Sequence, residues 1–596
     1  TAHPSNPFGR AVKPYYWRPF AKAGTLPSHL EGSGFNRRDY PYYTDAYKFG
    51  GNYRIADTTW EGETWIGYQT YRRRVKAVEI SMSRMTAALN GQGGPGGDEW
   101  FNPFGSADSR SPEFVSGLAG QGGTENSQSV VDWMHVDNYH QTDQTRLQYI
   151  DAIFNGEIMD IPMGTIRGAF GFQIRHIRDW NYNDPLELRG DDISDDPSGS
   201  INPIIARDSG VRSAFAEIEI PLLTDSVIGN VGIKAAVRYE DFYTLGYDTT
   251  KPKISLLWEL NDVVAFRASY GESFLAPSPS QLRQALQEYC TDVPDDDPDP
   301  ITGLSMEGLP SCTSGNPNLN AEESDIINFG VSFRPIEGLS IDIDYQEIEY
   351  FDKIQTLISD EVTSAQYYDF LAATNYTEAS YDTSNPAHVA DGVAWVLANP
   401  NPLVNRFPDG SVEAIIRAPV NYATQFVEGF DVRARYSFDY RDWGRFTVGL
   451  SGNYYTEWKY QQSPTTPIVE AIGTSNSNTA FAPPIAEWKG SISMSWFRNN
   501  HSASITTRYI DEMIYDETTR AVGFSASDNP YIRAITKTDA RYSFRFNIWD
   551  TDGNMTAGVT NLFDRDAQRL PQRGGIESRI DDPFGRQYYV SLDFEF

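Results

Sequence analysis

The sequence predicts an all-β protein, a transmembrane antiparallel β-barrel, and three observations support this fold class. Segments of 9 to 12 residues alternate between apolar and polar side chains along much of the 596-residue chain. Tight turns and long loops alternate between these segments, which is typical of bacterial membrane barrels. No run of about 18 apolar residues is present, which excludes a helical span but not strands that show lipid only every second side chain.

The alternation is clearest in residues 339–346, 430–438, 541–548 and 588–596, where every second position is apolar. A soluble antiparallel sheet with one buried face alternates in the same way. The segments, however, are close to the about 9–11 residues that a tilted strand needs to cross the hydrocarbon layer. The polar positions carry both Arg and Asp, which suits a polar lumen. Strand length and connection length together favour the membrane barrel.

About 18 strands are expected, and counting back from a periplasmic C-terminus puts every long loop outside the cell. The strands lie near residues 13–23, 48–59, 61–74, 143–155, 162–178, 209–222, 229–243, 251–260, 262–272, 322–335, 338–350, 424–438, 443–458, 485–497, 500–512, 532–547, 553–561 and 586–596. The long loops are at about 75–142, 179–208, 273–321, 351–423, 459–484 and 563–585. Short helices within them are expected at 77–90, 359–374 and 386–398.

The net charge of −32 comes from 81 acidic and 49 basic residues. This balance argues against nucleic acid as a partner, because phosphate binding needs clustered Lys and Arg. A cell surface bathed in salt and divalent cations and simple solubility in a saline habitat both explain it.

One acidic loop holds both cysteines of the chain, Cys290 and Cys312, and their spacing suggests a disulfide formed in an oxidising compartment. Between them lies an acidic run that begins at Asp292, and the oxygen atoms of its last four aspartates are suitable ligands for Ca²⁺, the one cofactor considered. These residues are Asp295, Asp296, Asp297 and Asp299. Their spacing differs from the EF-hand pattern and prolines interrupt it, so a solvated acidic loop is the alternative.

Six aromatic residues in or beside the loops are candidate ligand contacts, because flat rings with polar edges stack on sugars or hold peptides. They are Trp100, Phe101, Tyr367, Tyr368, Trp458 and Tyr460. Packing within loops or in an aromatic girdle is the favoured explanation of such residues. No Gly-x-Ser-x-Gly elbow, His-Glu-x-x-His motif or phosphate-binding glycine loop is present. The sequence therefore does not predict an enzyme.

Three stretches resemble the TonB-dependent outer-membrane receptors. Gly558–Asp564, followed by 582–589 and a terminal Phe596, looks like the last two strands of that family. Ala268–Pro277 is close to its mid-barrel signature, with Leu275 in place of the usual Arg. Asn316–Ser324 precedes two further strands in the order that the family shows. More weakly, an Asn-Pro-Phe-Gly loop that begins at residue 102 resembles large-looped proteobacterial members.

The resemblance implies an importer in the outer membrane of a Gram-negative bacterium. It also implies a barrel of 22 strands, a plug domain with a TonB box, and a TonB–ExbB–ExbD motor that acts through the plug. The barrel-assembly machinery would recognise the last strand, with a signal made by Tyr588, Phe594 and Phe596. A surface lipoprotein is a further candidate partner. Loops of this length suggest a bulky ligand: an oligosaccharide, a peptide or a metal chelate.

The chain departs from the family pattern at its start. Neither plug, TonB box nor signal peptide is recognisable, and about four strands are missing upstream, so residues 1–596 are expected to be one barrel that is incomplete at its N-terminus. Without a plug, an 18-stranded barrel would be a passive porin. A secreted acidic glycoside hydrolase with a sandwich or propeller fold is the less favoured alternative.

Overall fold

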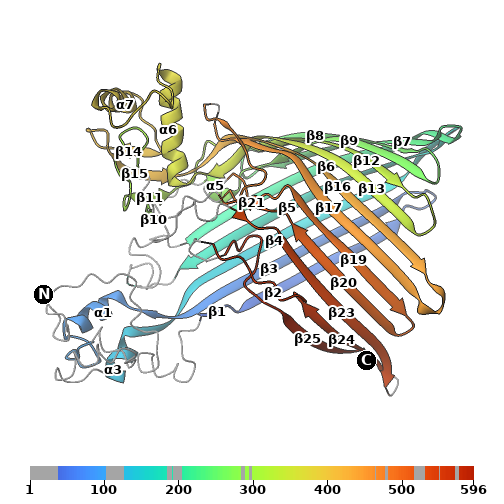
Figure 1. Cartoon of the computed structure of the whole chain (residues 1–596), viewed down its shortest axis with the longest axis horizontal. Helices are drawn as coiled ribbons and strands as arrows, with labels where there is room; N and C mark the ends of the chain where they lie inside the picture. Colours follow the sequence, from blue (N-terminus) through green and yellow to red (C-terminus); the bar gives the residue numbers. More distant parts are fainter. Residues whose placement is uncertain are drawn as a thin grey trace.

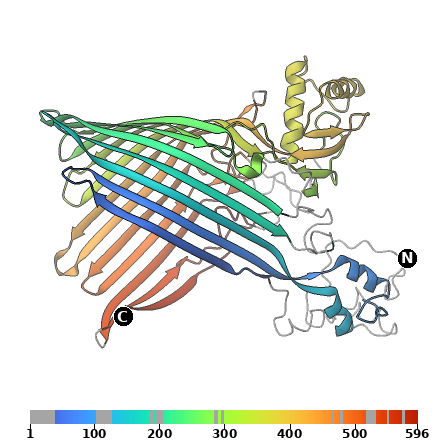
Figure 2. The same cartoon turned by 180° about the vertical axis from the view of Figure 1, so that it is seen from behind.

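A single curved sheet dominates the protein (Figures 1 and 2). The computed structural model describes residues 38–101, 126–183, 191, 204–282, 289–293, 298–463, 465–476, 479, 481–515, 531–548, 551–570 and 576–595. Within these residues the sheet has 19 strands. The sandwich and propeller folds required by the hydrolase alternative are therefore wrong.

The sheet is an antiparallel meander in which each long strand pairs with the next long strand of the sheet. The long strands are β2 (Tyr42–Arg54), β3 (Glu61–Ile80), β4 (His135–Ile161), β5 (Gly164–Asn183), β6 (Ile204–Ser226), β7 (Gly229–Phe242), β8 (Tyr247–Glu259), β9 (Val264–Leu275), β12 (Glu322–Phe333), β13 (Leu339–Thr356), β16 (Pro419–Asp439), β17 (Arg445–Gln461), β19 (Trp488–Arg498), β20 (His501–Ile510), β23 (Ile535–Ile548), β24 (Thr551–Thr560) and β25 (Gln587–Glu595). Two short strands, β1 (Arg38–Asp39) and β18 (Ile468–Glu470), join β3 and β17.

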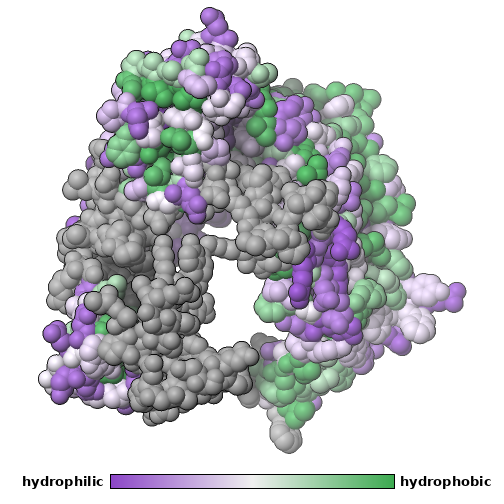
Figure 3. All heavy atoms as spheres, turned by 60° about the vertical axis from the view of Figure 1, so that its left-hand side comes forward, coloured by the Kyte–Doolittle hydropathy of each residue, from purple (hydrophilic) through white to green (hydrophobic). Residues whose placement is uncertain are grey.

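Alternation of side chains sorts the sheet into an apolar outer face and a polar inner face, because successive residues of a strand point to opposite sides. On β13, Ile343 lies on the outer face and is 44% exposed, whereas its neighbours Asp342 and Asp344 point inward. In the space-filling view, hydrophilic side chains border the opening into the interior, and apolar ones appear on the outer wall (Figure 3).

The two edges of the sheet are β2 and β25, and among the described strands no hydrogen-bonded pairing joins them. The first predicted strand, 13–23, lies outside the described residues. Each of the other 17 predicted strands overlaps a long strand. Closure of the ring and the family's 22 strands therefore stay predictions.

Short turns collect at one end of the sheet, here called the turn end, and long connections collect at the other, the loop end (Figure 1). This separation is the one that the sequence predicts. The bounds of the loops differ, because β3 and β4 continue beyond the membrane-length segment as a paired ribbon as far as Ile80 and His135. Consequently, part of the predicted first loop is strand, and so are residues 77–80 of the predicted first helix.

Two lobes stand at the loop end. The first contains α1 (Met82–Leu89) and α3 (Gln128–Met134) around a small apolar core. The second contains a four-stranded sheet covered by two helices, which agree with the predicted helices at 359–374 and 386–398. Its elements are β10 (Tyr289–Asp292), β11 (Pro310–Thr313), β14 (Val404–Arg406), β15 (Val412–Arg417), α6 (Ser359–Ala373) and α7 (Pro386–Ala398).

Smaller elements complete the described chain. They are α5 (Pro279–Leu282), a 3-10 turn (Arg441–Trp443), β21 (Met513–Ile514) and β22 (Tyr531–Ile532). These elements were not predicted from the sequence as separate elements, and neither were α3 and the sheet of the second lobe. Among the described helices, none has the length and apolar character needed to span a membrane.

Candidate functional site

The inner wall of the sheet carries paired charges at mid-height. Arg267 of β9 donates to Asp344 of β13 with Nε–Oδ1 at 2.7 Å, and Asn453 of β17 donates to Asp431 of β16 at 3.0 Å. These residues follow one another across adjacent strands, because each is the direct register partner of the next, with Gly330 of β12 between Arg267 and Asp344. A hollow of about 620 Å³ at this level is lined by charges of both signs, Arg433 included. The predicted polar lumen is thus present.

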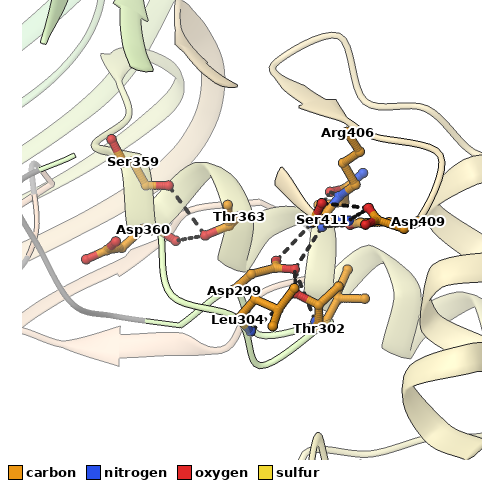
Figure 4. Close-up of polar contacts among 12 residues, drawn as sticks. Asp299, Thr302, Leu304, Ser359, Asp360, Thr363, Arg406, Asp409 and Ser411 are labelled. Carbon is orange, nitrogen blue, oxygen red and sulfur yellow. Dashed lines mark hydrogen bonds and ion pairs between the residues drawn. The ribbon is translucent and has the colours of Figure 1, made fainter. Parts of the chain in front are cut away.

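The second lobe is organised by a buried ion pair between Asp299 and Arg406 (Figure 4). Nη1 and Nη2 of Arg406 lie 2.8 and 2.9 Å from the two carboxylate oxygens, and the side chains are only 4% and 1% exposed. Thr302 donates its backbone N–H and its hydroxyl to the same carboxylate. These hydrogen bonds are needed, because removing one partner of a buried ion pair leaves an unpaired charge and costs roughly 3–5 kcal/mol of stability.

Arg406 in turn fixes the amide of Gln366 on α6. Nε and Nη2 of the guanidinium donate to Oε1 of Gln366 at 3.1 and 2.9 Å. Because a guanidinium has only donors, the amide oxygen must face it and the amide nitrogen must face away. Gln366 is 2% exposed, and its Nε2 has no hydrogen-bond partner among the described residues.

Gln366 is one of the residues that line a hollow of about 810 Å³, here called the lobe hollow. Its walls come from the loop 314–318, from α6, from the segment 399–403 that follows α7, and from residues 416–420, where β15 leads into β16. The hollow therefore lies where the second lobe joins the barrel wall. Its size falls within the about 300–1,000 Å³ that is usual for small-molecule sites.

A cluster of tyrosines supports the helices of the same lobe. The ring of Tyr381 packs edge-on against Phe370 with centroids 5.0 Å apart, and its hydroxyl donates to the carbonyl of Ile301 at 2.7 Å. Burial, together with the negative charge of Asp299, raises the pKa of Tyr381 to about 12. Burial and a hydrogen bond to Glu378 raise the pKa of Tyr368 to about 12 as well. These phenols stay neutral donors at physiological pH.

Two of the six predicted ligand contacts are core residues, so that prediction is wrong for them. Phe101 is 1% exposed in the apolar core of the first lobe. Tyr460 is 6% exposed and stacks on Phe481, with centroids 5.5 Å apart and planes at 9°. Both rings bury apolar area against neighbouring loops, which is what loop aromatics do when the loops fold into a lobe.

The other four aromatic residues are more accessible. Trp100 is 48% exposed at the edge of the first lobe. Trp458 is half-buried and packs edge-on against Tyr455 at 5.1 Å. Tyr367 and Tyr368 are half-buried on α6, and neither lines the lobe hollow. A ligand contact of these four stays a prediction.

The predicted Ca²⁺ site in the acidic loop between the cysteines is wrong for one of its four aspartates. Asp299 is the acidic half of the buried ion pair, so it is not available to Ca²⁺ as proposed. The other three aspartates, Asp295, Asp296 and Asp297, lie outside the described residues, and no group of three metal-ligating side chains occurs among those that are described. Calcium binding by this loop stays a prediction without Asp299.

The predicted disulfide has support from the backbone. Cys290 of β10 and Cys312 of β11 are direct partners in the antiparallel register. Opposed residues have Cα atoms about 4.5–5.5 Å apart, within the range that a disulfide spans. No free cysteine is found in the described part of the chain. The side chain of Cys290 lies outside it, so the bond itself stays a prediction.

The proposed assembly signal lies on the edge strand β25. Tyr588 and Phe594 are 72% and 44% exposed on its outer face. Phe596 lies outside the described residues.

Sequence reasoning missed the residues that build the lobe hollow, above all Gln366, Arg406 and Trp395. The signal that could have found part of the site is the Asn-Pro-Asn-Pro run at 399–402, directly after a predicted helix, since such a run ends a helix and fixes the loop that follows. Nothing in the sequence pairs Asp299 with Arg406, which is 107 residues away.

Comparison with known proteins gives one family and a set of structural neighbours. A sequence profile described as "TonB dependent receptor-like, beta-barrel" matches residues 19–562. The siderophore receptor PirA from Acinetobacter baumannii superposes with a TM-score of 0.52 at 12% identity, over 93% of this chain and 62% of PirA. The outer membrane transporter YddB from Escherichia coli gives 0.54 at 10% identity, over 96% and 64%.

The chain thus spans less than two thirds of the length of either solved structure. At these identities the likeness is one of fold. A search of curated protein sequences found no match.

Proposed function

Because the chain belongs to the TonB-dependent receptor family, we propose that it forms the barrel of an active importer for a bulky or scarce ligand. The family consists of receptors and transporters in the outer membrane of Gram-negative bacteria, not of enzymes. The outer face of the sheet contacts membrane lipid, and the loop end faces the outside of the cell. The observation that carries the proposal is the match of the family's barrel profile to residues 19–562.

The inner wall supports active import over simple passage. A meander of this many strands encloses a space too wide for side chains to fill, since barrels of about 16 strands already leave a channel. The paired charges on the wall, such as Arg267 with Asp344, are suited to hydrogen-bonding a plug. A plug coupled to the TonB–ExbB–ExbD motor would make transport depend on energy.

The loop end supports capture of a large ligand. Two folded lobes, rather than simple loops, stand there, and one of them contains the lobe hollow. An oligosaccharide, a peptide or a metal chelate is the proposed cargo. A surface lipoprotein that covers the loop end and the barrel-assembly machinery acting on β25 are the further proposed partners.

Growth of a deletion strain tests the proposal. The strain is grown on neutral oligosaccharides, peptides and ferric chelates as scarce sources of carbon or iron, and is compared with the parent and with a strain that lacks TonB. We expect one class of nutrient to require both the receptor and TonB. Uptake that requires the receptor but survives without TonB would instead establish a passive porin.

A further inference from the structure

We propose that the lobe hollow binds a neutral oligosaccharide, which would make it the capture site of the importer. This inference rests on the proposed function and names the class of its ligand.

The amide of Gln366, one of the residues that line the hollow, is held in one orientation. The chain of contacts from Asp299 through Arg406 to Oε1 of Gln366 determines which way the amide points. It leaves Nε2 of Gln366 buried and unsatisfied by any described residue. A buried donor without a partner costs about 1–3 kcal/mol. The amide of Gln366 is therefore a fixed part of the lining rather than a freely rotating surface group.

The wall after α7 offers a donor and an acceptor side by side. Nδ2 of Asn399 donates to the carbonyl of Trp395 at 2.9 Å, and Oδ1 of Asn401 accepts from the backbone N–H of Leu403 at 2.9 Å. In the described contacts these bonds use one end of each amide. The ends that remain are an acceptor on Asn399 and a donor on Asn401. A sugar hydroxyl donates one hydrogen bond and accepts others, so it matches such a pair.

An aromatic ring and a carboxylate complete the lining. Trp395 of α7 is half-buried and packs edge-on against Phe370 at 5.7 Å, which holds the plane of the indole. Aromatic faces stack on the apolar C–H face of a sugar ring, while the polar groups take its hydroxyls. Asp369 of α6 is exposed at the rim, and its Oδ1 accepts from Thr465 at 2.9 Å. It is placed to accept further hydroxyls.

The charge of the hollow favours a neutral ligand over an anionic one. Among the described lining residues there is one carboxylate, Asp369, and no Lys, Arg or His. Arg417 follows the lining residue Ile416 on β15, and its side chain points to the opposite face of the strand. Anionic metal chelates need cations for recognition, and a chain of net charge −32 repels them. A neutral, hydroxyl-rich ligand fits this lining best.

Binding to the purified full-length chain tests the inference. The protein, extracted from outer membranes in detergent, is applied to an array of neutral α- and β-linked hexasaccharides of glucose, mannose, galactose and xylose. The strongest binder is then titrated by calorimetry. We expect Trp395→Ala to weaken it by about tenfold or more, since stacking is lost. Asp369→Asn, at the exposed rim, should weaken it less without disturbing the fold.

Trp443→Ala is the matched control, because Trp443 is an exposed tryptophan in the short turn between β16 and β17, at the turn end of the sheet, and its loss should leave binding unchanged. If no glycan binds, or if Trp395→Ala binds as the wild type does, the inference is overturned. Binding of a tripeptide library or of a ferric chelate that is lost in Trp395→Ala, without glycan binding, overturns it as well. Glycan binding at the hollow together with TonB-independent growth would overturn only the proposed function. TonB-dependent growth without glycan binding would overturn only this inference.

Discussion

Arg267 on β9 reaches across strand β12 to form an ion pair with Asp344 on β13, with Nε–Oδ1 at 2.7 Å. The residue between them in the register is Gly330, which is the direct partner of both. A β-carbon at Gly330 would lie 2.2 Å from Oδ1 of Asp344 and 2.4 Å from Nε of Arg267. Because Gly330 has no side chain, Arg267 and Asp344 can contact each other across the strand that lies between them.

Replacing Gly330 with alanine should displace this pair. Both side chains are partly exposed, so the pair itself contributes about 1 kcal/mol or less, and the crowding adds a cost of about 1–3 kcal/mol. We expect Gly330→Ala to lower the temperature at which the folded barrel converts to the slower-migrating form in a gel-shift assay. Gly232→Ala is the control, because its β-carbon would meet only the carbonyl of Ile220, at 3.9 Å. Equal transition temperatures for the two variants would contradict the prediction.

Removing the guanidinium of Arg406 should unfold the second lobe while the barrel stays intact. Arg406→Met leaves the carboxylate of Asp299 buried without its partner, at a cost of about 3–5 kcal/mol. We expect faster proteolysis within residues 298–417 and an unchanged gel-shift temperature. Arg445→Met, which removes an exposed partner of Asp439, should change neither. The double change Asp299→Leu with Arg406→Met should recover part of the resistance, and no recovery would argue against an unpaired charge as the cause.

Alternation of side chains was enough to predict the barrel wall, because every strand must show lipid on one side and water on the other. The motif Gly558–Asp564 covers the end of β24, and Ala268–Pro277 covers β9, so the family resemblance and the strand pattern point to the same elements. The ends of β3 and β4 were not predictable. Beyond the membrane neither face of this ribbon contacts lipid, so its residues need not alternate between apolar and polar, and the pattern is lost.

The lobe hollow was not predictable, because it depends on contacts between residues far apart in the chain. Gln366, Arg406 and Asp299 are ordinary polar residues in sequence, and only the fold buries them together. The search for loop aromatics selected Phe101 and Tyr460, which the lobes use as core residues. The sequence alone does not distinguish an exposed loop aromatic from a buried one, because burial depends on how the loop folds.

The cysteine pair gives a direct chemical test of the lobe sheet. Cys290 and Cys312 face each other in register, so a bond between them would close a loop of about 20 residues and stabilise the lobe by about 3 kcal/mol. We expect the denatured protein to take up no maleimide before reduction and two labels after it, as measured by mass. Labelling of unreduced protein would contradict the disulfide. Cys312→Ser should make β10 and β11 more sensitive to protease.

Asp581 should make the last long loop sensitive to acid. Its carboxylate is 6% exposed and lies 2.6 Å from Nζ of Lys537 and 2.9 Å from Nη1 of Arg565. Burial alone would raise the pKa of Asp581, but hydrogen bonds from Lys537 and Arg565 outweigh it and hold the pKa below its ordinary value. A lowered pKa means that the folded loop binds its proton more weakly than the unfolded loop does.

The stabilisation is therefore complete above the ordinary aspartate pKa of about 3.9 and is lost as the pH falls through the lowered value. We expect hydrogen exchange in residues 576–585, corrected for its intrinsic pH dependence, to be slow at neutral pH and to accelerate only below about pH 4. In Asp581→Asn the fast exchange should already be present at neutral pH. Asp566→Asn, at an exposed aspartate of the same loop, should exchange as the wild type does. Exchange in Asp581→Asn that is as slow at neutral pH as in the wild type would show that the carboxylate of Asp581 does not hold this loop.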